Sequence, residues 1–298
     1  DSVTMAVEAA RYALRRAKVD PKDIGAVHIG SESKPYSVKS SGSIVAEAIG
    51  ASSNLIASDF EFACKAGTEA IQTCIGLVAS EMIKYGLAIG VDAAQAAPSD
   101  ELEYTVACGG AAFLLGKKTD ETIAYFECSC SYVTDTPDFW RRAEKPYPSH
   151  AGRFTGEPAY FRHIINAAKS LMDESGCKPE DFDYVVFHQP NLKYPLKAGS
   201  ILGFTKKQLE PGLLVSSLGN AYAGSAMLGL VKVLEVAKPG DRILVVSYGS
   251  GSGSDAFCIT VQNNYGGGNP TPLLSQLFVH KKYIDYIQYA KFRRKLVF

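Results

Sequence analysis

The segment PKDIGAV at residues 21–27 returns as PEDFDYV at residues 179–185, 158 positions further along the chain. Two other short matches keep the same order at similar offsets: AGT at residues 66–68 with AGS at residues 223–225, and Ala112-Phe113 with Ala256-Phe257. Each match alone would be uninformative, but three in one order indicate an internal duplication. The chain is therefore predicted to fold as two halves built from one pattern.

Helices and short apolar strands alternate along both halves. In the first half we expect helices over residues 5–17, 38–49 and 65–84, and strands over 24–30, 55–58, 87–91 and 104–115. In the second half we expect helices over residues 159–174, 192–202 and 223–236, and strands over 123–133, 184–188, 213–215, 242–247 and 256–261. Short β-rich apolar runs between helices of this length are typical of largely parallel sheets covered on both faces.

This pattern predicts an α/β fold of duplicated, layered α-β-α-β-α halves whose sheets are mixed and mostly parallel. The polar stretch over residues 117–122 is the expected seam. We therefore assign residues 1–118 to an N-terminal half and residues 119–298 to a C-terminal half. Because the chain opens directly on a helix with no strand before it, we expect a native N-terminal segment to precede residue 1.

Composition limits the classes of partner. The 31 basic and 31 acidic residues give no net charge, so no overall field attracts nucleic acid or a membrane surface. No apolar run reaches the roughly 18 residues that a membrane-spanning helix needs, and no signal-peptide pattern opens the chain. The seven cysteines are scattered and include no C-x-x-C pair, which argues against a disulfide framework and a metal site. We expect a reducing, cytoplasmic environment.

Cys64 is the candidate nucleophile. It follows a short apolar strand and opens a helix rich in small residues, CKAGTEA at residues 64–70. At a helix N-terminus, the dipole and the free N–H groups favour a thiolate and can hold the oxygen of an acyl thioester. A buried core cysteine is the commoner role of a lone cysteine. The repeat favours the catalytic role here, because it aligns Cys64 with Ala221 and the fold therefore needs only a small residue at this point.

Two polar residues at predicted strand ends are candidates to act with Cys64. His188 follows three apolar residues at the carboxyl end of a strand, where open α/β sheets present their ligand sites. Glu32 lies just beyond the matching first-half strand, within two positions of the residue that the repeat aligns with His188. A solvated surface carboxylate is the ordinary alternative for Glu32. His163, by contrast, is expected on a helix surface without a special role.

The pseudo-twofold relation brings further groups to the same place. It puts Asn220 at the helix start opposite Cys64, and Glu32 and His188 at opposing strand ends. The sequence GSGSG at residues 249–253 gives a backbone loop that is free to approach a ligand closely. This loop is not a phosphate-binding loop of the P-loop kind, because it lacks the Lys-Ser/Thr ending and no helix follows it.

Together these motifs resemble the thiolase superfamily and, within it, the archaeal hydroxymethylglutaryl-CoA synthases. The likeness rests on four segments: FACKAGT at residues 62–68, FHQPN at residues 187–191, GNAYAGS at residues 219–225 and SYGSG at residues 247–251. It runs along nearly the whole chain, although the family's opening strand and loop have no counterpart in this sequence. The resemblance implies a thiolase-like fold and an acyltransferase that performs a Claisen- or aldol-type condensation.

The resemblance also implies roles for individual residues. Cys64 would carry the acetyl group of acetyl-CoA, Glu32 would remove a methyl proton from it, and His188 would protonate the alkoxide formed on acetoacetyl-CoA. Motif matching places Thr105, Thr155, Asn220 and Ser250 in the acyl site, and Arg153, Lys193 and Lys197 at the CoA phosphates. No metal and no organic cofactor is implied.

The implied partners are a second copy of the chain, in a homodimer, and an assembly with an acetoacetyl-CoA thiolase and a small OB-fold protein. The product would serve isoprenoid synthesis through the mevalonate pathway. Other functions stay open: a ketoacyl synthase of the Cys-His-Asn kind, against which Glu32 argues, and a condensing enzyme that uses carrier-protein thioesters. A catalytically silent scaffolding subunit of a thiolase assembly and a Cys-His-Asn hydrolase are the alternatives from other classes.

Overall fold

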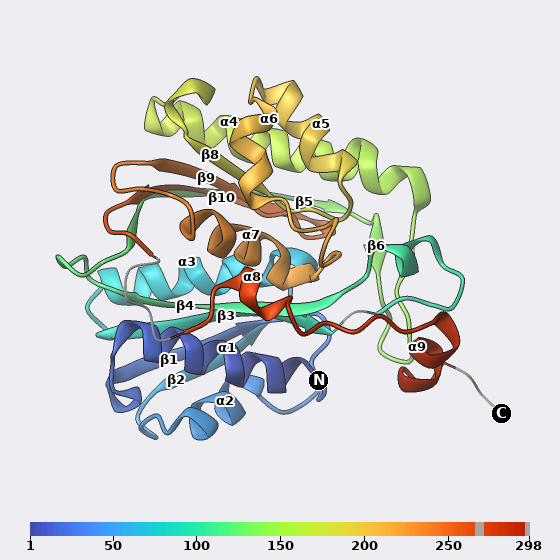
Figure 1. Ribbon diagram of the computed structural model, residues 1–298, viewed down its shortest axis with the longest axis horizontal. Coiled ribbons are helices and arrows are strands. Elements are labelled where there is room, and N and C mark those ends of the chain that lie inside the picture. Colours follow the sequence, from blue (N-terminus) through green and yellow to red (C-terminus); the bar gives the residue numbers. More distant parts are fainter. Residues whose placement is uncertain (94, 266–270, 296–298) are drawn as a thin grey trace.

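The computed structural model has layers in the order helices, sheet, helices, sheet, helices (Figure 1). It describes residues 1–93, 95–265 and 271–295. No helix within these residues is long and apolar enough to cross a membrane.

The first sheet has the strand order β2-β1-β3-β4. Its strands are β1 (Ile24–Gly30), β2 (Ile56–Phe60), β3 (Tyr85–Ala93) and β4 (Cys108–Gly116). β1 pairs in parallel with β2 and β3, whereas β4 runs antiparallel to β3. Helices α1 (Ser2–Ala17) and α2 (Ser41–Ile49) cover the outer face and bury an apolar cluster against the sheet. This burial supplies the main stabilisation of the layer.

The second sheet has the strand order β5-β10-β9-β8. Its strands are β5 (Ala124–Thr136), β8 (Tyr184–Phe187), β9 (Arg242–Val246) and β10 (Gly251–Val261). β8 and β9 are parallel, and β10 is antiparallel to both of its neighbours. On its outer face lie α4 (Phe161–Ser175), α5 (Lys193–Leu202) and α6 (Lys206–Leu209), at the top of the molecule in Figure 1.

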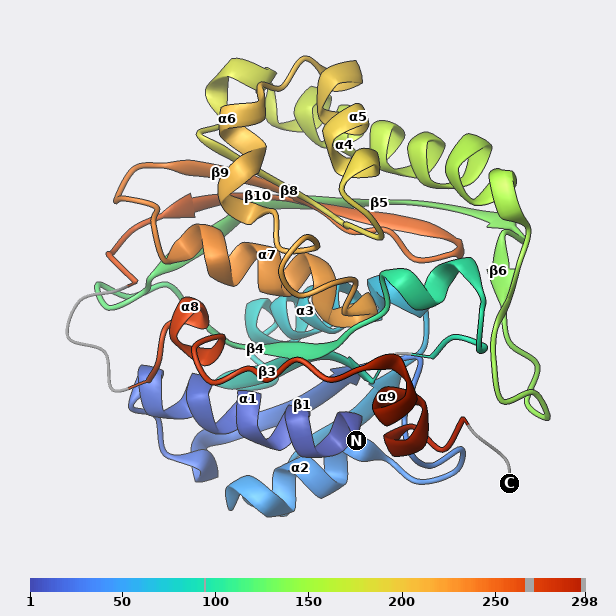
Figure 2. The ribbon, with the colours of Figure 1, turned by 45° about the vertical axis from the view of Figure 1, so that its right-hand side comes forward.

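Helices α3 (Ala66–Ala79) and α7 (Ser225–Leu234) form the middle layer between the two sheets (Figure 2). Glycines let the backbones of the two halves meet there. A Cβ on Gly67 would lie 2.6 Å from the carbonyl oxygen of Ala223, and a Cβ on Gly90 would lie 2.5 Å from the same atom. Because these distances are too short for any side chain, the contact between the halves requires glycine at both positions.

Several elements have no counterpart in the repeat. A short hairpin of β6 (Phe139–Trp140) and β7 (Ser149–His150) follows β5. After β10, the chain returns along the first half through α8 (Leu274–Leu277) and α9 (Tyr286–Phe292), as Figure 2 shows. The boundary proposed at residues 118/119 stays a prediction.

The layered α/β architecture confirms the predicted fold class, but the strand predicted over residues 213–215 is wrong. The side chain of Gln189 takes the place of a neighbouring strand. Its oxygen accepts hydrogen bonds from the N–H groups of Leu214 and Val215 at 2.6 and 2.9 Å, and its amide nitrogen donates to Gly212 O at 2.9 Å. The backbone hydrogen-bonding groups of this segment therefore have partners although the segment is not part of the sheet.

The repeat alignment also needs a correction at the nucleophile. α3 follows a 3-10 turn, Ala63–Lys65, and α7 follows the 3-10 turn Tyr222–Gly224. Ala63 and Tyr222 both have positive φ angles, 44° and 50°. The structural counterpart of Cys64 is therefore Ala223 rather than Ala221. The sequence match was misleading because AGT at residues 66–68 lies in α3, whereas most of AGS at residues 223–225 lies in the turn before α7. Since Ala223 is also small, the conclusion drawn from the repeat is unchanged.

Candidate active site

Cys64 lies in the turn between β2 and α3, one residue after the strained Ala63. A positive φ is unfavourable for alanine and holds the turn in a sharp conformation only where the surroundings enforce it. The Cys64 side chain is 7% exposed and packs against Tyr222, with Val106 and Phe139 beside them. The nucleophile candidate thus sits where both halves meet the hairpin segment that carries Phe139.

Glu32 lies against Cys64. The thiol donates to Glu32 Oε2 across 3.8 Å. The loop that carries Glu32 is held by Asp92, at the carboxyl end of β3. Asp92 Oδ1 accepts from the Glu32 N–H at 3.0 Å and from the hydroxyls of Ser31 and Ser33 at 2.8 and 2.6 Å. Oδ2 accepts from the N–H of Ala223 at 2.8 Å, so the same carboxylate ties the Glu32 loop to the second half.

The electrostatics of this pair differ from the sequence-based prediction. We expected a thiolate at a helix N-terminus, but burial and then the charges of Glu32, Asp92 and Asp138 raise the pKa of Cys64 well above its usual value. Burial, followed by the charges of Asp92 and Glu61, likewise raises the pKa of Glu32 well above the ordinary range. The resting site therefore holds a neutral thiol beside a carboxyl group of increased proton affinity.

His188 follows the carboxyl end of β8, as predicted. Its backbone is fixed on both sides, because its N–H donates to Val246 O at 2.9 Å and its carbonyl accepts from the Tyr160 hydroxyl at 2.6 Å. The side chain is 2% exposed, and its Nδ1 has no hydrogen-bond partner among the described residues. Burial lowers the pKa of His188 to about 3. The imidazole is therefore neutral and can donate one hydrogen bond.

Asp138 and Tyr248 connect the surroundings of Cys64 with those of His188. The Tyr248 hydroxyl donates to Asp138 Oδ2 at 2.7 Å, and the Tyr248 ring centroid is 6.2 Å from that of His188. Asp138 is fully buried and also accepts from the N–H of Gly251 at 2.8 Å. Its charge contributes to the raised pKa of Cys64. A thiol, a carboxyl group and a neutral imidazole thus belong to one connected set of buried contacts, and groups of these kinds are the ones that covalent acyl transfer followed by proton abstraction uses.

Comparison with known proteins identifies the family. A curated hydroxymethylglutaryl-CoA synthase from Pyrococcus horikoshii is 60% identical over all 298 residues, and the match covers 85% of that protein. The chain belongs to the hydroxymethylglutaryl-CoA synthase family. A synthase of the same name from Methanocaldococcus jannaschii is 60% identical over 99% of this chain and 86% of its own length.

The fold agrees with this assignment. Residues 172–261 match the family described as 3-oxoacyl-(acyl-carrier-protein) synthase III C terminal. The solved structure of MvaS in complex with 3-hydroxy-3-methylglutaryl coenzyme A superposes with a TM-score of 0.89, covering 99% of this chain and 80% of that one at 22% identity. The thiolase-like fold is thereby confirmed, and the curated relatives at about 60% identity confirm an acyl-transferring condensing activity. The match to the synthase III model reflects the shared fold, while the curated relatives at 60% identity support the hydroxymethylglutaryl-CoA synthase prediction rather than the ketoacyl synthase, scaffold or hydrolase alternatives.

The structure brings some of the predicted acyl-site residues of this synthase together. Asn220 N–H donates to Thr105 O at 2.6 Å, which places these two residues side by side. The Asn220 side-chain oxygen accepts from the N–H of Tyr222 at 2.9 Å, so it caps the turn that packs against Cys64. Thr155 donates from its hydroxyl to Asp138 O at 3.3 Å. Ser250 is half-buried in the turn that Gly249 and Gly253 close.

The predicted CoA-phosphate cations are exposed and lie on neighbouring segments. Arg153 is in the 3-10 turn Gly152–Thr155, and Lys193 and Lys197 are one helical turn apart on α5. The Lys197 ammonium group lies 3.2 Å from the carboxylate of Glu157. Glu157 belongs to the turn Gly156–Tyr160, which directly follows the turn that contains Arg153. An exposed pair of this kind is weak, so a phosphate can compete for Lys197.

Sequence analysis missed several residues of the site. Asp92 follows an apolar run at a strand end, the signal that identified His188, and could have been found in the same way. Asp138 and Phe139 lie in a segment without a repeat counterpart and gave no signal. The expectation for His163 was wrong. It is fully buried, its Nδ1 contacts Ala159 O at 2.6 Å and its Nε2 contacts the Thr134 hydroxyl at 2.8 Å.

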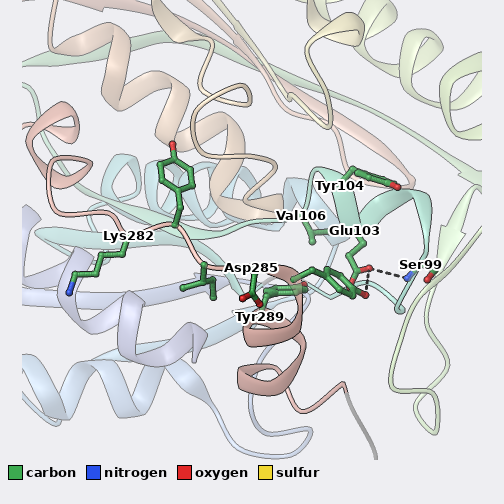
Figure 3. Close-up of a pocket in the computed structure, with 10 residues that line it drawn as sticks. Ser99, Glu103, Tyr104, Val106, Lys282, Asp285 and Tyr289 are labelled. Atoms are coloured by element: carbon green, nitrogen blue, oxygen red, sulfur yellow. Dashed lines mark hydrogen bonds between the residues drawn. The ribbon is translucent and has the colours of Figure 1, made fainter.

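A cavity of about 740 Å³ lies outside this site (Figure 3). Its lining includes Glu103 and Tyr104 from the first half, Asp285 at the start of α9 and Tyr289 within α9. Val106 is the point at which this cavity meets the apolar cluster around Cys64. Over the described residues, no group of three or more His, Cys, Asp or Glu side chains could hold a metal ion.

Proposed function

We propose that the protein condenses acetyl-CoA with acetoacetyl-CoA to form hydroxymethylglutaryl-CoA through an acetyl thioester on Cys64. The observation that carries this proposal is the contact of 3.8 Å between the Cys64 thiol and the Glu32 carboxylate, in a site that also presents a neutral His188. The names of the relatives, with 60% identity along the chain, support the choice of substrates.

In the first step, Cys64 attacks the acetyl-CoA carbonyl. Because the pKa of the thiol is raised, its proton must leave during the attack, and Glu32 is the group placed to accept it. The C–S bond to CoA breaks as the new thioester forms, and the proton leaves with the CoA thiol. Glu32 is then a carboxylate again and is free to act on the acetyl group.

In the second step, Glu32 removes a proton from the methyl carbon of acetyl-Cys64. The resulting carbanion forms a carbon–carbon bond to the ketone carbon of acetoacetyl-CoA, and the ketone oxygen becomes an alkoxide. His188 donates a hydrogen bond to this oxygen from its neutral ring and passes its ring proton to it as the charge develops. The proton that Glu32 took from the methyl carbon then replaces the one His188 gave up, so that the imidazole is again neutral and Glu32 is again a carboxylate. Water then cleaves the thioester to Cys64 and releases the product.

The remaining roles follow the same proposal. Thr105, Thr155, Asn220 and Ser250 line the acyl site, while Arg153, Lys193 and Lys197 bind the CoA phosphates as exposed cations. No metal or organic cofactor takes part in the proposed steps. The free cysteines suit the reducing cytoplasm as the place of the reaction. The proposal also includes a homodimer and an assembly with an acetoacetyl-CoA thiolase and a small OB-fold protein. The reaction would serve the mevalonate pathway.

The test is Glu32→Gln, which keeps the size of the side chain and removes the base. Carbon–carbon bond formation should fall by about 100-fold or more, because proton removal from the methyl group has no other base. Acetylation of Cys64 also loses its proton acceptor in this variant, but the departing CoA sulfur can take up the thiol proton, so this step should fall by only about 10-fold or less. Since Glu32 acts as a carboxylate and its pKa is raised, condensation in the unmodified protein should increase with pH through that raised pKa. The variant should lose this dependence.

Both steps are followed in the same preparations, by the amount of acetyl-enzyme after rapid mixing with acetyl-CoA and by the amount of product. Equal loss of both steps would indicate a structural Glu32. Full retention of both would remove Glu32 from the mechanism.

A further inference from the structure

Lys65, the residue after the nucleophile, is a lysine inside the protein. It is 1% exposed, and its Nζ lies 3.0 Å and 3.2 Å from the two carboxylate oxygens of Asp255, which is fully buried. Nζ also donates to Glu69 and lies 4.3 Å from the centre of the Phe62 ring. Removing two charges from water has a large free-energy cost, which such a pair recovers only if its geometry is well satisfied. The pair therefore calls for an explanation beyond general stability.

The carboxylate of Asp255 joins three elements of the two halves. It sits on β10 and accepts from the Thr68 hydroxyl on α3 at 2.6 Å and from the Ser131 hydroxyl on β5 at 2.8 Å. Through these hydrogen bonds and its ion pair with Lys65, the Asp255 carboxylate fixes the start of α3, next to Cys64, to the second sheet. The partners are 190 positions apart in the chain, so no local structure enforces the contact.

The same network reaches the strand end that carries His188. The Thr68 hydroxyl contacts that of Ser247 at 2.7 Å, and the Ser247 N–H donates to Asp255 O at 2.9 Å. Ser247 directly follows Val246, whose carbonyl accepts from the His188 N–H at 2.9 Å. A continuous set of contacts thus runs from the residue beside Cys64 to the backbone of His188.

The backbones on this path are in close contact. A Cβ on Gly249 would lie 2.2 Å from Phe62 O and 2.9 Å from the Lys65 N–H nitrogen, and a Cβ on Gly253 would lie 3.1 Å from Lys65 Cε. With so little space, a change in the Lys65 side chain shifts the turn of Cys64 relative to the strand end of His188.

We propose that Lys65 and Asp255 are a positioning pair that sets the placement of Cys64 relative to His188. This inference rests on the proposed function. Acetylation of Cys64 needs the cysteine and is assisted by Glu32, and both residues belong to the first half. Condensation needs in addition His188, from the second half. Loss of the pair should therefore affect the second step more than the first.

The experiment uses the double variant Lys65→Met/Asp255→Asn, which removes both charges and so leaves no unpaired charge in the interior. The rate of acetyl-enzyme formation should stay within about threefold, whereas condensation should fall about 10- to 100-fold, as expected for a displacement of around 1 Å between reacting groups. Ser131→Ala is the matched control, because it removes one hydrogen bond from the same carboxylate and leaves Lys65 in place. It should keep the ratio of the two rates.

Thermal unfolding establishes that each variant is folded at the assay temperature. If the double variant does not fold, Asp255→Asn alone takes its place, since Lys65 then keeps Glu69 as its partner, and the same change in the ratio is expected. An unchanged ratio in a folded variant would show that the pair serves stability alone and would overturn the inference. Failure of the unmodified protein to form acetyl-Cys64 would instead overturn the proposed function, and the inference with it.

Discussion

Protonating His188 inside the fold has a free-energy cost because the ring is 2% exposed and burial lowers its pKa to about 3. A group whose pKa is lowered in the folded state contributes stability that is present above its unfolded pKa and is lost as the pH falls. Between about pH 6.5 and pH 3, the unmodified protein should therefore lose stability through His188. Asp92 acts in the opposite direction, because burial raises its pKa to about 6.

The variant His188→Gln isolates the contribution of the histidine. Between about pH 7 and pH 4, its free energy of unfolding should fall less than that of the unmodified protein, by about 3 kcal/mol. Denaturant titrations at the two pH values measure this difference. His280→Gln is the control, since His280 is exposed and the variant should behave like the unmodified protein. An identical pH dependence in His188→Gln would mean that the ring is not buried as described.

Single residues differed in how far sequence could predict them. His188 and Glu32 could be singled out because polar residues at the carboxyl ends of parallel strands stand out against apolar runs, and the structure places Glu32 against Cys64 and His188 at the end of β8. Their catalytic roles stay predictions. The charge state of Cys64 was predicted wrongly, since the raised pKa comes from burial and from Asp92 and Asp138, which tertiary structure brings near. Lys65 gave no signal, because a lysine beside a helix start is normally exposed.

At the scale of elements, the side chain of Gln189 replaces a strand. It is 1% exposed and satisfies three backbone groups between Gly212 and Val215. In Gln189→Leu these groups stay buried without partners, so the free energy of unfolding should fall by about 2–4 kcal/mol. Gln262→Leu, which removes a single surface hydrogen bond to Thr119, should cost less than about 1 kcal/mol. Equal losses in the two variants would contradict this account of the loop.

Most strands and helices that follow the apolar period were predicted to within a few residues, as with β1 over Ile24–Gly30. The helix predicted over residues 65–84 is wrong at its end, which lies at Ala79, and the strand predicted over residues 104–115 begins only at Cys108, after the 3-10 turn Glu101–Tyr104. Their signal is local and repeats in both halves. The hairpin of β6 and β7 and the helices α8 and α9 were not predicted. They are short and pack on surfaces that exist only after the two halves have folded, so their sequences carry little periodic signal.

For the whole molecule, contact between the halves depends on glycine. A Cβ on Gly90 would lie 2.3 Å from Met227 Sδ and 2.5 Å from Ala223 O, whereas a Cβ on Gly76 in α3 meets nothing within 4 Å. Gly90→Ala should therefore reduce the free energy of unfolding by about 2–3 kcal/mol. Gly76→Ala should increase it by about 0.5–1 kcal/mol, because a helix favours alanine. Chemical denaturation of both variants compares them, and a stable Gly90→Ala would show that the halves are less tightly packed.

The duplication was visible in the sequence because three short matches keep one order, and it predicted the layered fold correctly. The residue-by-residue alignment of the two halves was not predicted correctly. The similar segments AGT and AGS differ in structure, because AGT lies in a helix and most of AGS lies in the turn before a helix. Only the paired positive φ angles of Ala63 and Tyr222 show which residues correspond. Convergence of the two halves on Cys64 is thus predictable in outline, while the distances in the site require the structure.

The central claim is that Cys64 carries the acetyl group. Mass spectrometry of the protein after brief incubation with acetyl-CoA, followed by digestion and peptide mapping, tests it most directly. We expect one acetyl thioester, on the peptide that contains Cys64, and no acetylated cysteine in Cys64→Ala, which should also form no product. An acetyl group on another residue of the unmodified protein, or continued product formation by Cys64→Ala, would contradict the account.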